Sequence, residues 1–306
     1  MIPVIIGVSF LVFFILDLAP GDAVDILAPE GATAEDLEAI RHDLGLDQPV
    51  IVRYVKYMGG MLHGDMGVSY VSKTDVFDTY MEKLPATIKL SFASILVSIL
   101  LSVPLGIYSA TRQGTVQDNI SMIVAMIGLS MPNFWLGLLL IIVFSLNLGW
   151  FPSGGDQTLS SIVLPAITIG TGLMATLTRT TRSSMLDVLK QEYLRTARAK
   201  GIPEKIVITS HALRNALIPI ITIIGTQLAG VLDGSVLTET VFAWPGVGRL
   251  IVDSLNMRDT PLVTGSIIMT TILLSIILLL VDLLYAVVDP RIKAQYVAKR
   301  GKKKHG

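Results

Sequence analysis

The chain has 306 residues, of which 52% are hydrophobic and only 16% are charged. Soluble domains carry about 25% charged residues, so this composition and a mean hydropathy of +0.66 exclude an ordinary soluble domain. They predict an all-α integral membrane protein. The formal net charge is zero and cysteine is absent, which excludes disulfides and thiolate metal ligands.

Six apolar stretches are long enough to cross a bilayer, which takes about 20 residues, or about 17 at a tilted or thinned site. The first, residues 2–18, has no small-residue cleavage site and is predicted to be a retained span. The others are residues 90–110, 120–146, 162–177, 216–236 and 262–288. Pro104, Pro132 and Pro165 lie inside the second to fourth stretches, where bundled helices tolerate such kinks.

The connection between the first two stretches is long enough to fold by itself, and its acidic residues outnumber its basic ones. Thr33 and Asp36 form a capping-box variant at the start of a helix that Gly45 ends. A second helix is predicted from Pro49 to Gly64. A third begins at Thr74 or Asp75 and ends at Pro85.

These elements predict one membrane protein in four parts. Residues 1–19 form the first transmembrane helix, and residues 20–88 form a helical extracytoplasmic insertion. Residues 89–288 form the core transmembrane domain, which includes a polar loop at residues 179–215. Residues 289–306 form a basic cytoplasmic tail.

The distribution of Lys and Arg predicts the orientation, because connections on the cytoplasmic side are enriched in them. If both termini are cytoplasmic, most of the 24 basic residues fall inside. They cluster between Arg179 and Arg214 and between Arg291 and Lys304. The first stretch has no basic flank of its own to fix its direction.

The polar loop reads EYLRTARAKG from Glu192 to Gly201. Nearly all of its residues up to Lys200 favour a helix, Gly201 suits a left-handed C-cap, and Pro203 suits the first turn of another helix. Two short helices at the inner surface could pass a push from a soluble partner to the fourth and fifth spans. An ordinary basic inside loop is the alternative, which explains the charges but not the spacing of Ala197, Ala199 and Gly201.

At these residues the chain resembles the inner-membrane permease subunits of binding-protein-dependent ABC importers, which carry an EAA loop. Arg195, Thr196 and Ala197 followed by Gly201 fit the spacing of that pattern, although Arg195 replaces its Glu. Downstream, only Leu213 matches the generic pattern. The variant, with HALRN from His211 to Asn215, is similar to that of the peptide/nickel branch.

Other stretches resemble the B-type subunit of dipeptide and oligopeptide permeases, and the likeness covers nearly the whole chain. They are LAPGD (18–22), LGLDQP (44–49), GDMG (64–67), ETVFAWPGVG (239–248), RDTP (258–261) and DPR (289–291). Relatives usually begin with a basic cytoplasmic flank of several residues, which is missing before residue 2.

The resemblance implies a division of labour. Two such permeases form the pore, and the resemblance favours a heterodimer with a C-type partner over pairing of this chain with itself. Two ATP-binding subunits dock beneath it, and an extracytoplasmic binding protein delivers the substrate. The chain has no G-x-x-x-x-G-K-[ST] phosphate cradle, so it is expected to be no enzyme, with ATP and Mg bound by the partners, and no nucleic acid is expected to bind. The resemblance implies that the protein is located in the inner membrane of a prokaryote.

The residues assigned to coupling with the ATP-binding subunits share one loop. They are Glu192, Tyr193, Arg195, Thr196, Ala197, Ala199, Gly201, His211 and Arg214. His211 is interpreted as a polar member of this loop rather than a metal ligand, because the other three His lie in other segments. No metal site is predicted.

A second set is assigned to the outer face near the pore: Trp244, Pro245, Gly246, Gly248, Arg258 and Asp259. The Trp-Pro-Gly turn is either a re-entrant or capping element at the pore mouth or a tight connector with an interfacial tryptophan. Gln227, Asp233 and Asp282 are polar groups at membrane depth, which are functional candidates by default. Pairing between helices is the alternative role for the two acids.

The predicted function is therefore a permease subunit that forms half of the pore of an ATP-driven importer of di- or oligopeptides. A nickel complex or glutathione is the alternative substrate. An ion-coupled secondary transporter would carry its own midplane site within inverted repeats, and no two halves of this chain mirror each other. An intramembrane enzyme would need a nucleophile and base inside the spans, where no His occurs.

Overall fold

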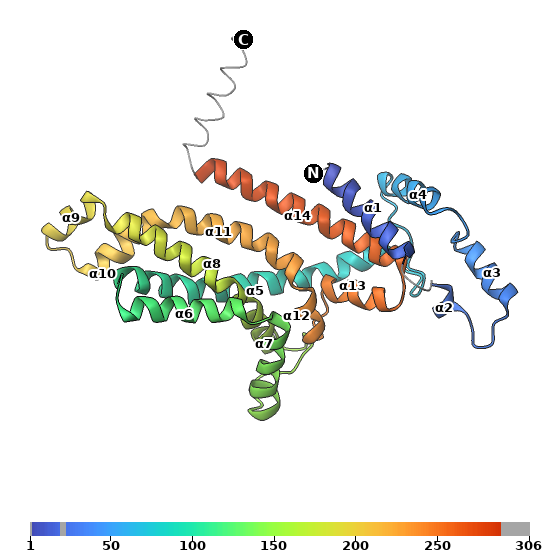
Figure 1. Cartoon of the computed structure of the whole chain (residues 1–306), viewed down its shortest axis with the longest axis horizontal. Coiled ribbons are helices and arrows are strands. Elements are labelled where there is room, and N and C mark those ends of the chain that lie inside the picture. Colours follow the sequence, from blue (N-terminus) through green and yellow to red (C-terminus); the bar gives the residue numbers. More distant parts are fainter. Residues whose placement is uncertain (1, 19–22, 289–306) are drawn as a thin grey trace, which may run out of the picture. The chain divides into compact units, whose positions relative to one another are not determined.

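The computed structural model describes residues 2–18 and 23–288. They form helices connected by short loops (Figure 1), with one isolated β-bridge between Val68 and Asp75. Before the fifth helix lie α1 (Ile2–Leu18), α2 (Val24–Leu27), α3 (Ala34–Asp43) and α4 (Val50–Leu62). The rest are α5 (Val76–Thr111), α6 (Val116–Ser130), α7 (Asn133–Leu140), η1 (Ile141–Asn147), η2 (Leu159–Ile162), α8 (Val163–Leu189), α9 (Glu192–Ala199), α10 (Glu204–Ile206), η3 (Val207–Ala212), α11 (Leu213–Gly234), α12 (Val236–Val241), α13 (Val247–Asn256) and α14 (Thr260–Val288). The predicted tail, residues 289–306, lies outside the described residues.

The chain divides into two compact units. One comprises Met1–Lys89 and Ser235–Ser275, and the other comprises Leu90–Gly234 and Ile276–Gly306. The first holds the predicted insertion together with α12 and α13. The second holds the polar loop predicted to couple to a partner.

An apolar core in the first unit joins the start of α5 to α13 and α14. Val76, Tyr80, Val247 and Leu262 are buried in it. Such burial is worth about 1.5–3 kcal/mol for a large side chain. This core therefore fixes the insertion to the helices that follow residue 246.

The capping box predicted at the start of α3 is present. The Asp36 amide donates to Thr33 Oγ1 at 3.3 Å, and the Thr33 amide donates to Asp36 Oδ2 at 2.9 Å. At the other end Gly45 adopts a φ of +67°. The amides of Gly45 and Leu46 donate back to the carbonyls of His42 and Arg41, the paired bonds of a left-handed C-cap.

The third helix predicted for the insertion does not end at Pro85. It continues as α5, a single helix of 36 residues from Val76 to Thr111. Proline removes one backbone hydrogen bond, but Tyr80 and Leu84 pack on the apolar core on one side of it, and the apolar span begins directly after it. Packing on both sides outweighs that local loss, so the prediction of a helix end at Pro85 was wrong.

In the second unit α8 packs against both α6 and α11 (Figure 1). The α6 contact is close at Gly128, where a Cβ would lie 2.4 Å from the Thr171 carbonyl oxygen. Helix pairs in membranes approach closely through such small residues. Helix α8 thereby becomes the centre of this unit.

The third predicted span, residues 120–146, is broken rather than continuous. Helices α6 and α7 with η1 are bent by 98° across the break between Ser130 and Asn133. Met131 precedes Pro132 and is extended, with ψ at 126°, because a residue before proline is pushed out of the helical region. The expectation of a tolerated kink at Pro132 was therefore too mild.

Four described helical segments are long and apolar enough to cross a bilayer: Val76–Thr111, Leu159–Leu189, Glu204–Leu232 and Thr260–Val281. The bent pair adds a fifth if it counts as one span. Helix α1 is apolar over 17 residues, close to the lower limit for a crossing. The predicted total of six spans stays a prediction.

Candidate coupling site

The polar loop folds as a helix, a sharp turn and a second helical segment. Helix α9 ends at a left-handed Gly201 with a φ of +74°. The Gly201 amide donates to the Arg198 carbonyl at 2.9 Å, and the Ile202 amide donates to the Ala197 carbonyl at 3.3 Å. These two bonds satisfy carbonyls that the helix end would otherwise leave without partners.

Side chains brace the turn from both sides. Arg198 donates two hydrogen bonds to the Glu204 carboxylate, at 3.0 and 2.9 Å. Asn215 of α11 donates to Tyr193 Oη at 2.6 Å, and Tyr193 Oη donates to the His211 carbonyl at 3.3 Å. The turn and α9 are thus held to the beginning of α11.

One face of α9 is buried in an apolar core shared with α8, η3 and α11. Leu194 is fully buried, and Ala197 lies beside it with Leu177 and Val207. This shared core packs α9 against α8, η3 and α11.

The other face of α9 is polar and exposed. Among the residues assigned to coupling, Ala197 is buried and His211 is half-buried; Glu192, Tyr193, Arg195, Thr196, Ala199, Gly201 and Arg214 are exposed. The Arg195 side chain is 82% exposed, and its ion pair with Glu192 spans 3.3 Å. A pair this exposed contributes about 0–1 kcal/mol, so this face is available to a partner.

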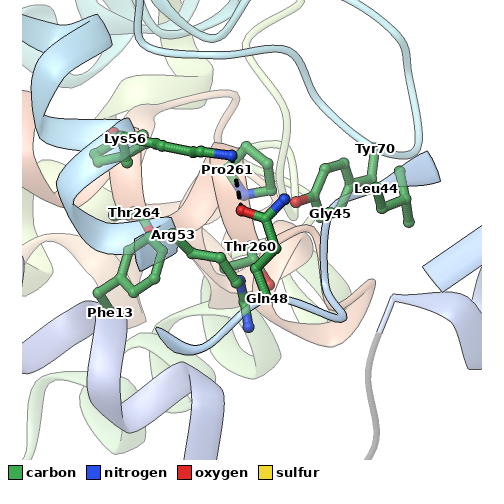
Figure 2. A pocket seen from close by; sticks show the side chains of 11 residues that line it. Phe13, Leu44, Gly45, Gln48, Arg53, Lys56, Tyr70, Thr260, Pro261 and Thr264 are labelled. Atoms are coloured by element: carbon green, nitrogen blue, oxygen red, sulfur yellow. Dashed lines mark hydrogen bonds between the residues drawn. The ribbon is translucent and has the colours of Figure 1, made fainter. Parts of the chain in front are cut away.

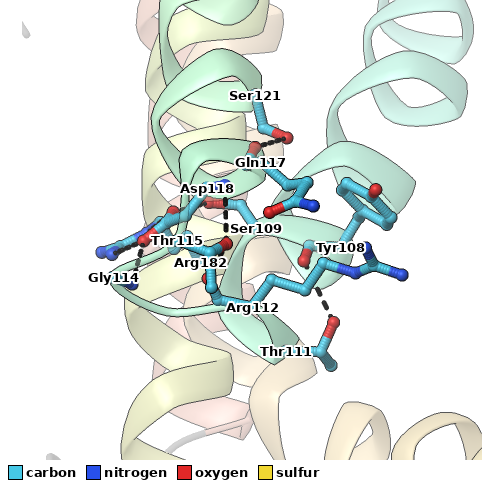
Figure 3. Close-up of polar contacts among 10 residues, drawn as sticks. All are labelled: Tyr108, Ser109, Thr111, Arg112, Gly114, Thr115, Gln117, Asp118, Ser121 and Arg182. Atoms are coloured by element: carbon cyan, nitrogen blue, oxygen red, sulfur yellow. Dashed lines mark hydrogen bonds and ion pairs between the residues drawn. The ribbon is translucent and has the colours of Figure 1, made fainter.

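An ion pair that sequence reasoning missed joins the first turn of α6 to α8 (Figure 3). Arg182 Nε and Nη2 donate to the two Asp118 carboxylate oxygens at 2.7 and 2.6 Å. The Ser109 hydroxyl and the Gly114 amide, the latter at 3.0 Å, also donate to this carboxylate. The Asp118 side chain is only 4% exposed and that of Arg182 27%, so the pair is a largely buried, fully bonded connection.

One sequence signal could have drawn attention to Asp118. It follows Thr115 by three positions, and Thr115 caps α6 by accepting from the Asp118 amide at 3.4 Å. An acidic side chain is favourable in the first turn of a helix, which explains its position but not its partner. Arg182 is 64 residues away, and no local pattern pairs the two.

The stretch at residues 239–248, predicted to lie at the outer face, is built around a buried carboxylate. Glu239 of α12 is fully buried and accepts from Thr87 Oγ1 at 2.8 Å, Ser235 Oγ at 3.1 Å and the Arg249 amide at 3.1 Å. The Val247 amide donates to Thr87 Oγ1 at 2.8 Å. Glu239 and Thr87 therefore cap the start of α13, whose first amides lack partners within the helix.

Burial raises the pKa of Glu239, while hydrogen bonds from Thr87, Arg249, Ser235 and Gly248 oppose that rise. Desolvation disfavours the charged carboxylate, and donated hydrogen bonds favour it. Glu239 is a structural centre of this turn, a role that sequence reasoning did not assign to it.

The remaining outer-face residues occupy different environments. Trp244 is 1% exposed, and its Nε1 donates to the Ala86 carbonyl at 2.9 Å. Asp259 is also 1% exposed and accepts from the Ser69 hydroxyl and from the amides of Tyr70 and Val71 at 3.1 and 3.3 Å. Both are held inside the first unit, and Trp244 offers no surface to lipid headgroups.

Arg258 is exposed, with a φ of +52°, and its Nη1 lies 2.7 Å from Asp25 Oδ2. Pro245 is half-buried. Gly248 allows close packing, since a Cβ there would lie 2.6 Å from the Val236 Cα. Of the two charged residues in this set, Arg258 is exposed and Asp259 is buried.

Replacing Gly246 by alanine should destabilise the turn, because a Cβ would lie 2.4 Å from Glu239 Oε2. The backbone at Gly246, with a φ of −97°, suits alanine, so the effect arises from overlap alone and should cost about 1–3 kcal/mol. Thermal unfolding in detergent, followed by loss of the monodisperse elution peak, measures it. Gly59→Ala is the matched control, because a Cβ there has no neighbour within 4 Å; equal midpoints for the two variants would contradict the overlap.

Of the three polar groups predicted at membrane depth, only Gln227 has a described side chain. Gln227 of α11 donates from Nε2 to the Leu173 carbonyl of α8 at 3.0 Å. This bond joins two neighbouring helices, as polar side chains do in membranes. The side chains of Asp233 and Asp282 lie outside the described residues.

Two protein-family models match most of the chain. Residues 102–294 match the family described as binding-protein-dependent transport system inner membrane component, and residues 1–91 match its N-terminal family. The oligopeptide transport system permease protein AppB of Bacillus subtilis (strain 168) is 43% identical over 95% of this chain and 96% of its own length. The glutathione transport system permease protein GsiC of Escherichia coli (strain K12) is 40% identical over 96% of each.

Solved structures share the fold at low identity. An inward-facing structure of the MetNI methionine ABC transporter matches with a TM-score of 0.58 and 18% identity, over 70% of this chain and 97% of the other. An amino acid ABC transporter solved with histidines matches with a TM-score of 0.52 and 14% identity, over 68% and 94%. The fold is that of an ABC importer membrane subunit. The chain therefore belongs to the binding-protein-dependent transport system inner membrane component family, whose members are multi-pass permease subunits rather than enzymes.

Proposed function

We propose that this chain forms half of the translocation pore of an ATP-driven importer of di- or oligopeptides. Its other half is a C-type permease in a heterodimer, two ATP-binding subunits dock at residues 179–215, and a binding protein delivers substrate from outside. The oligopeptide permease relative, 43% identical over nearly the whole chain, supports the peptide substrate. The structural observation that carries the proposal is the exposed polar face of α9, whose opposite face lies in the core shared with α8 and α11.

Energy would enter through this loop from another polypeptide, since the chain has no phosphate-binding motif of its own. A partner that pushes on α9 displaces α8 and α11 together, because Leu194 and Ala197 are buried between them. Through the Asp118–Arg182 pair, the first turn of α6 would move together with α8. The proposed result is a switch of the pore between inward and outward access.

The six outer-face residues are proposed to form the gate at the outer end of the pore. They are Trp244, Pro245, Gly246, Gly248, Arg258 and Asp259. The buried bonds of Trp244 and Asp259 suit a rigid gate element that moves as a unit. With these residues at the outer end of the pore, both termini lie in the cytoplasm of a prokaryote. Gln227, Asp233 and Asp282 then lie at membrane depth.

Copurification tests the proposal directly. A tagged version of this chain, expressed with the genes beside it, should carry the two ATP-binding subunits through purification. Arg195→Ala should reduce their yield, because Arg195 lies on the exposed face proposed to bind them. Its ion pair contributes little to folding, so a lower yield would not reflect unfolding. Lys83→Ala, which removes an ion pair with Glu82 outside the loop, with side chains 33% and 71% exposed, is the control; equal yields from both variants would argue against docking at α9.

Glutathione is the second candidate substrate, favoured by the relative named as a glutathione permease. A nickel complex is a further alternative from the same family. The complete transporter in liposomes, with its binding protein outside and ATP inside, should accumulate a labelled dipeptide or oligopeptide. Uptake of labelled glutathione without uptake of peptides would assign the glutathione function instead.

A further inference from the structure

A cavity of about 210 Å³ lies in the first unit, among α1, α4, the turn after α3 and the start of α14 (Figure 2). Its polar lining includes Gln48, Arg53, Lys56, Tyr57 and Thr264. None of these residues belongs to the coupling loop or to the proposed outer gate. The cavity is smaller than the roughly 300–1,000 Å³ of drug-sized ligand pockets, so its ligand must be small.

Two hydroxyl groups at this cavity are buried and have no hydrogen-bond partner within the described part of the chain, namely Tyr57 Oη and Thr264 Oγ1. Thr264 is 1% exposed. Buried hydroxyls nearly always have a partner, and leaving one unsatisfied costs about 1–3 kcal/mol. Both residues line the cavity, so their unpartnered hydroxyls are candidate donors to an acceptor bound there.

The charges around the cavity also favour an acceptor. Arg53 Nη1 lies 2.7 Å from Asp17 Oδ1, so its charge already has a partner. Lys56 Nζ donates to the neutral Gln48 Oε1 at 2.7 Å (Figure 2). An ammonium group has three donors, so Lys56 retains both charge and donors for a ligand.

The tyrosines remain donors over the ordinary pH range. Burial, and secondarily the negative charge of Asp65, raise the pKa of Tyr57. Burial likewise raises the pKa of Tyr70, which also lines the cavity. Phe13 and Pro261 add apolar wall, which suits a short aliphatic part next to the acceptor.

We propose that this cavity binds the carboxylate of a small organic anion, with Lys56 as its ionic partner and the hydroxyls of Tyr57 and Thr264 as hydrogen-bond donors. A carboxylate is an acceptor-only group with two oxygens, which matches the Lys56 ammonium and the two hydroxyl donors; the nearby carboxylates of Asp65 and Asp259 do not line the cavity. The carboxylate can come from a free organic acid or from the C-terminus of a short peptide. The inference does not depend on which substrate the transporter carries.

Saturation-transfer NMR on the full chain in detergent tests this site, because it detects weak binding of small ligands. N-acetylglycine should show saturable binding, and its neutral analogue N-acetylglycinamide should not. Dialanine compared with dialanine amide tests whether a peptide terminus also enters. A signal from N-acetylglycine alone assigns a free acid, and a signal from both acids assigns the carboxylate from either source.

Variants locate the site. Lys56→Gln should weaken N-acetylglycine binding about 10- to 100-fold, the effect of losing a hydrogen bond to a charged group. Tyr57→Phe and Thr264→Val each remove a hydroxyl with little change of shape and should weaken it about 2- to 10-fold. Lys83→Gln is the control, because Lys83 pairs with Glu82 and does not line the cavity.

Four results would overturn the proposal. They are equal signals from acid and amide, unchanged binding by Lys56→Gln, displacement of the acid only by inorganic phosphate and not by other carboxylates, and absence of saturable binding. Identical elution profiles and helical circular dichroism of the variants establish that they are folded. Should Lys56→Gln fail to fold, Tyr57→Phe alone decides, since it removes a single oxygen atom.

Discussion

Replacing Gly201 by valine should uncouple ATP hydrolysis from transport, with little effect on the membrane helices. Gly201 has a φ of +74°, a left-handed conformation that costs a side-chain-bearing residue about 1–2 kcal/mol. A difference of that size reduces the population of the turned state about 5- to 30-fold. The amides of Gly201 and Ile202 would leave their carbonyls, and α9 would no longer hold one orientation. The measurement is ATP hydrolysis stimulated by loaded binding protein, together with peptide uptake, in the complete transporter.

Gly201→Asn separates backbone strain from mere bulk. Asparagine is the residue that most often replaces glycine at left-handed C-caps, so this variant should retain most of its coupled activity. A Cβ at residue 201 would meet no atom within 4 Å, which means that a loss in the valine variant cannot arise from overlap within this chain. Similar losses in the asparagine and valine variants would contradict the strain argument and would point to contact between the partner and the glycine itself.

Removing Asp118 should destabilise the second unit more than removing any exposed acid. Asp118→Leu leaves the guanidinium of Arg182, whose side chain is 27% exposed, without its carboxylate. It also strands the Ser109 hydroxyl and the Gly114 amide. Breaking a buried pair costs about 3–5 kcal/mol. Because Arg182 is partly exposed, we expect a loss at the lower end of that range, about 3 kcal/mol. Denaturant or thermal unfolding in detergent measures the loss.

The double variant Asp118→Leu/Arg182→Met should recover part of that stability, because no charge is then left buried alone. Glu204→Ala provides the matched comparison. It breaks the pair of Glu204 with Arg198, whose side chains are 55% and 40% exposed, and should cost at most about 1 kcal/mol. A double variant as unstable as Asp118→Leu would show that lost packing, and not a stranded charge, causes the effect.

Local signals predicted local structure well in this chain. The Thr33 and Asp36 side chains and the glycines at 45 and 201 each determine a helix end through bonds within a few residues, and all three predictions are confirmed. The same argument went too far at Pro85, where the packing of Tyr80 and Leu84 in the apolar core overrides the local preference. At Pro132 it did not go far enough, because the extended residue before the proline turns the chain by 98°.

The connections that build the sites could not be predicted in the same way. Asp118 meets Arg182 across 64 residues, and Thr87 meets Glu239 across 152. Such pairs depend on how whole helices meet, which periodicity and capping rules do not specify. Glu239 had been noted only as the first letter of a family stretch, and its role at the start of α13 emerged from the hydrogen bonds that Thr87, Ser235 and the Arg249 amide donate to its carboxylate.

The break at Pro132 also determines whether the chain crosses the membrane an even or an odd number of times. With α1 and the four long helices counted as crossings, the two ends share a compartment only if the bent pair α6–α7 contributes one more crossing. If it turns back to the leaflet it came from, the ends lie in opposite compartments. The native chain contains no cysteine, so single cysteines introduced near each end, probed with an impermeant maleimide in intact cells, would report this directly.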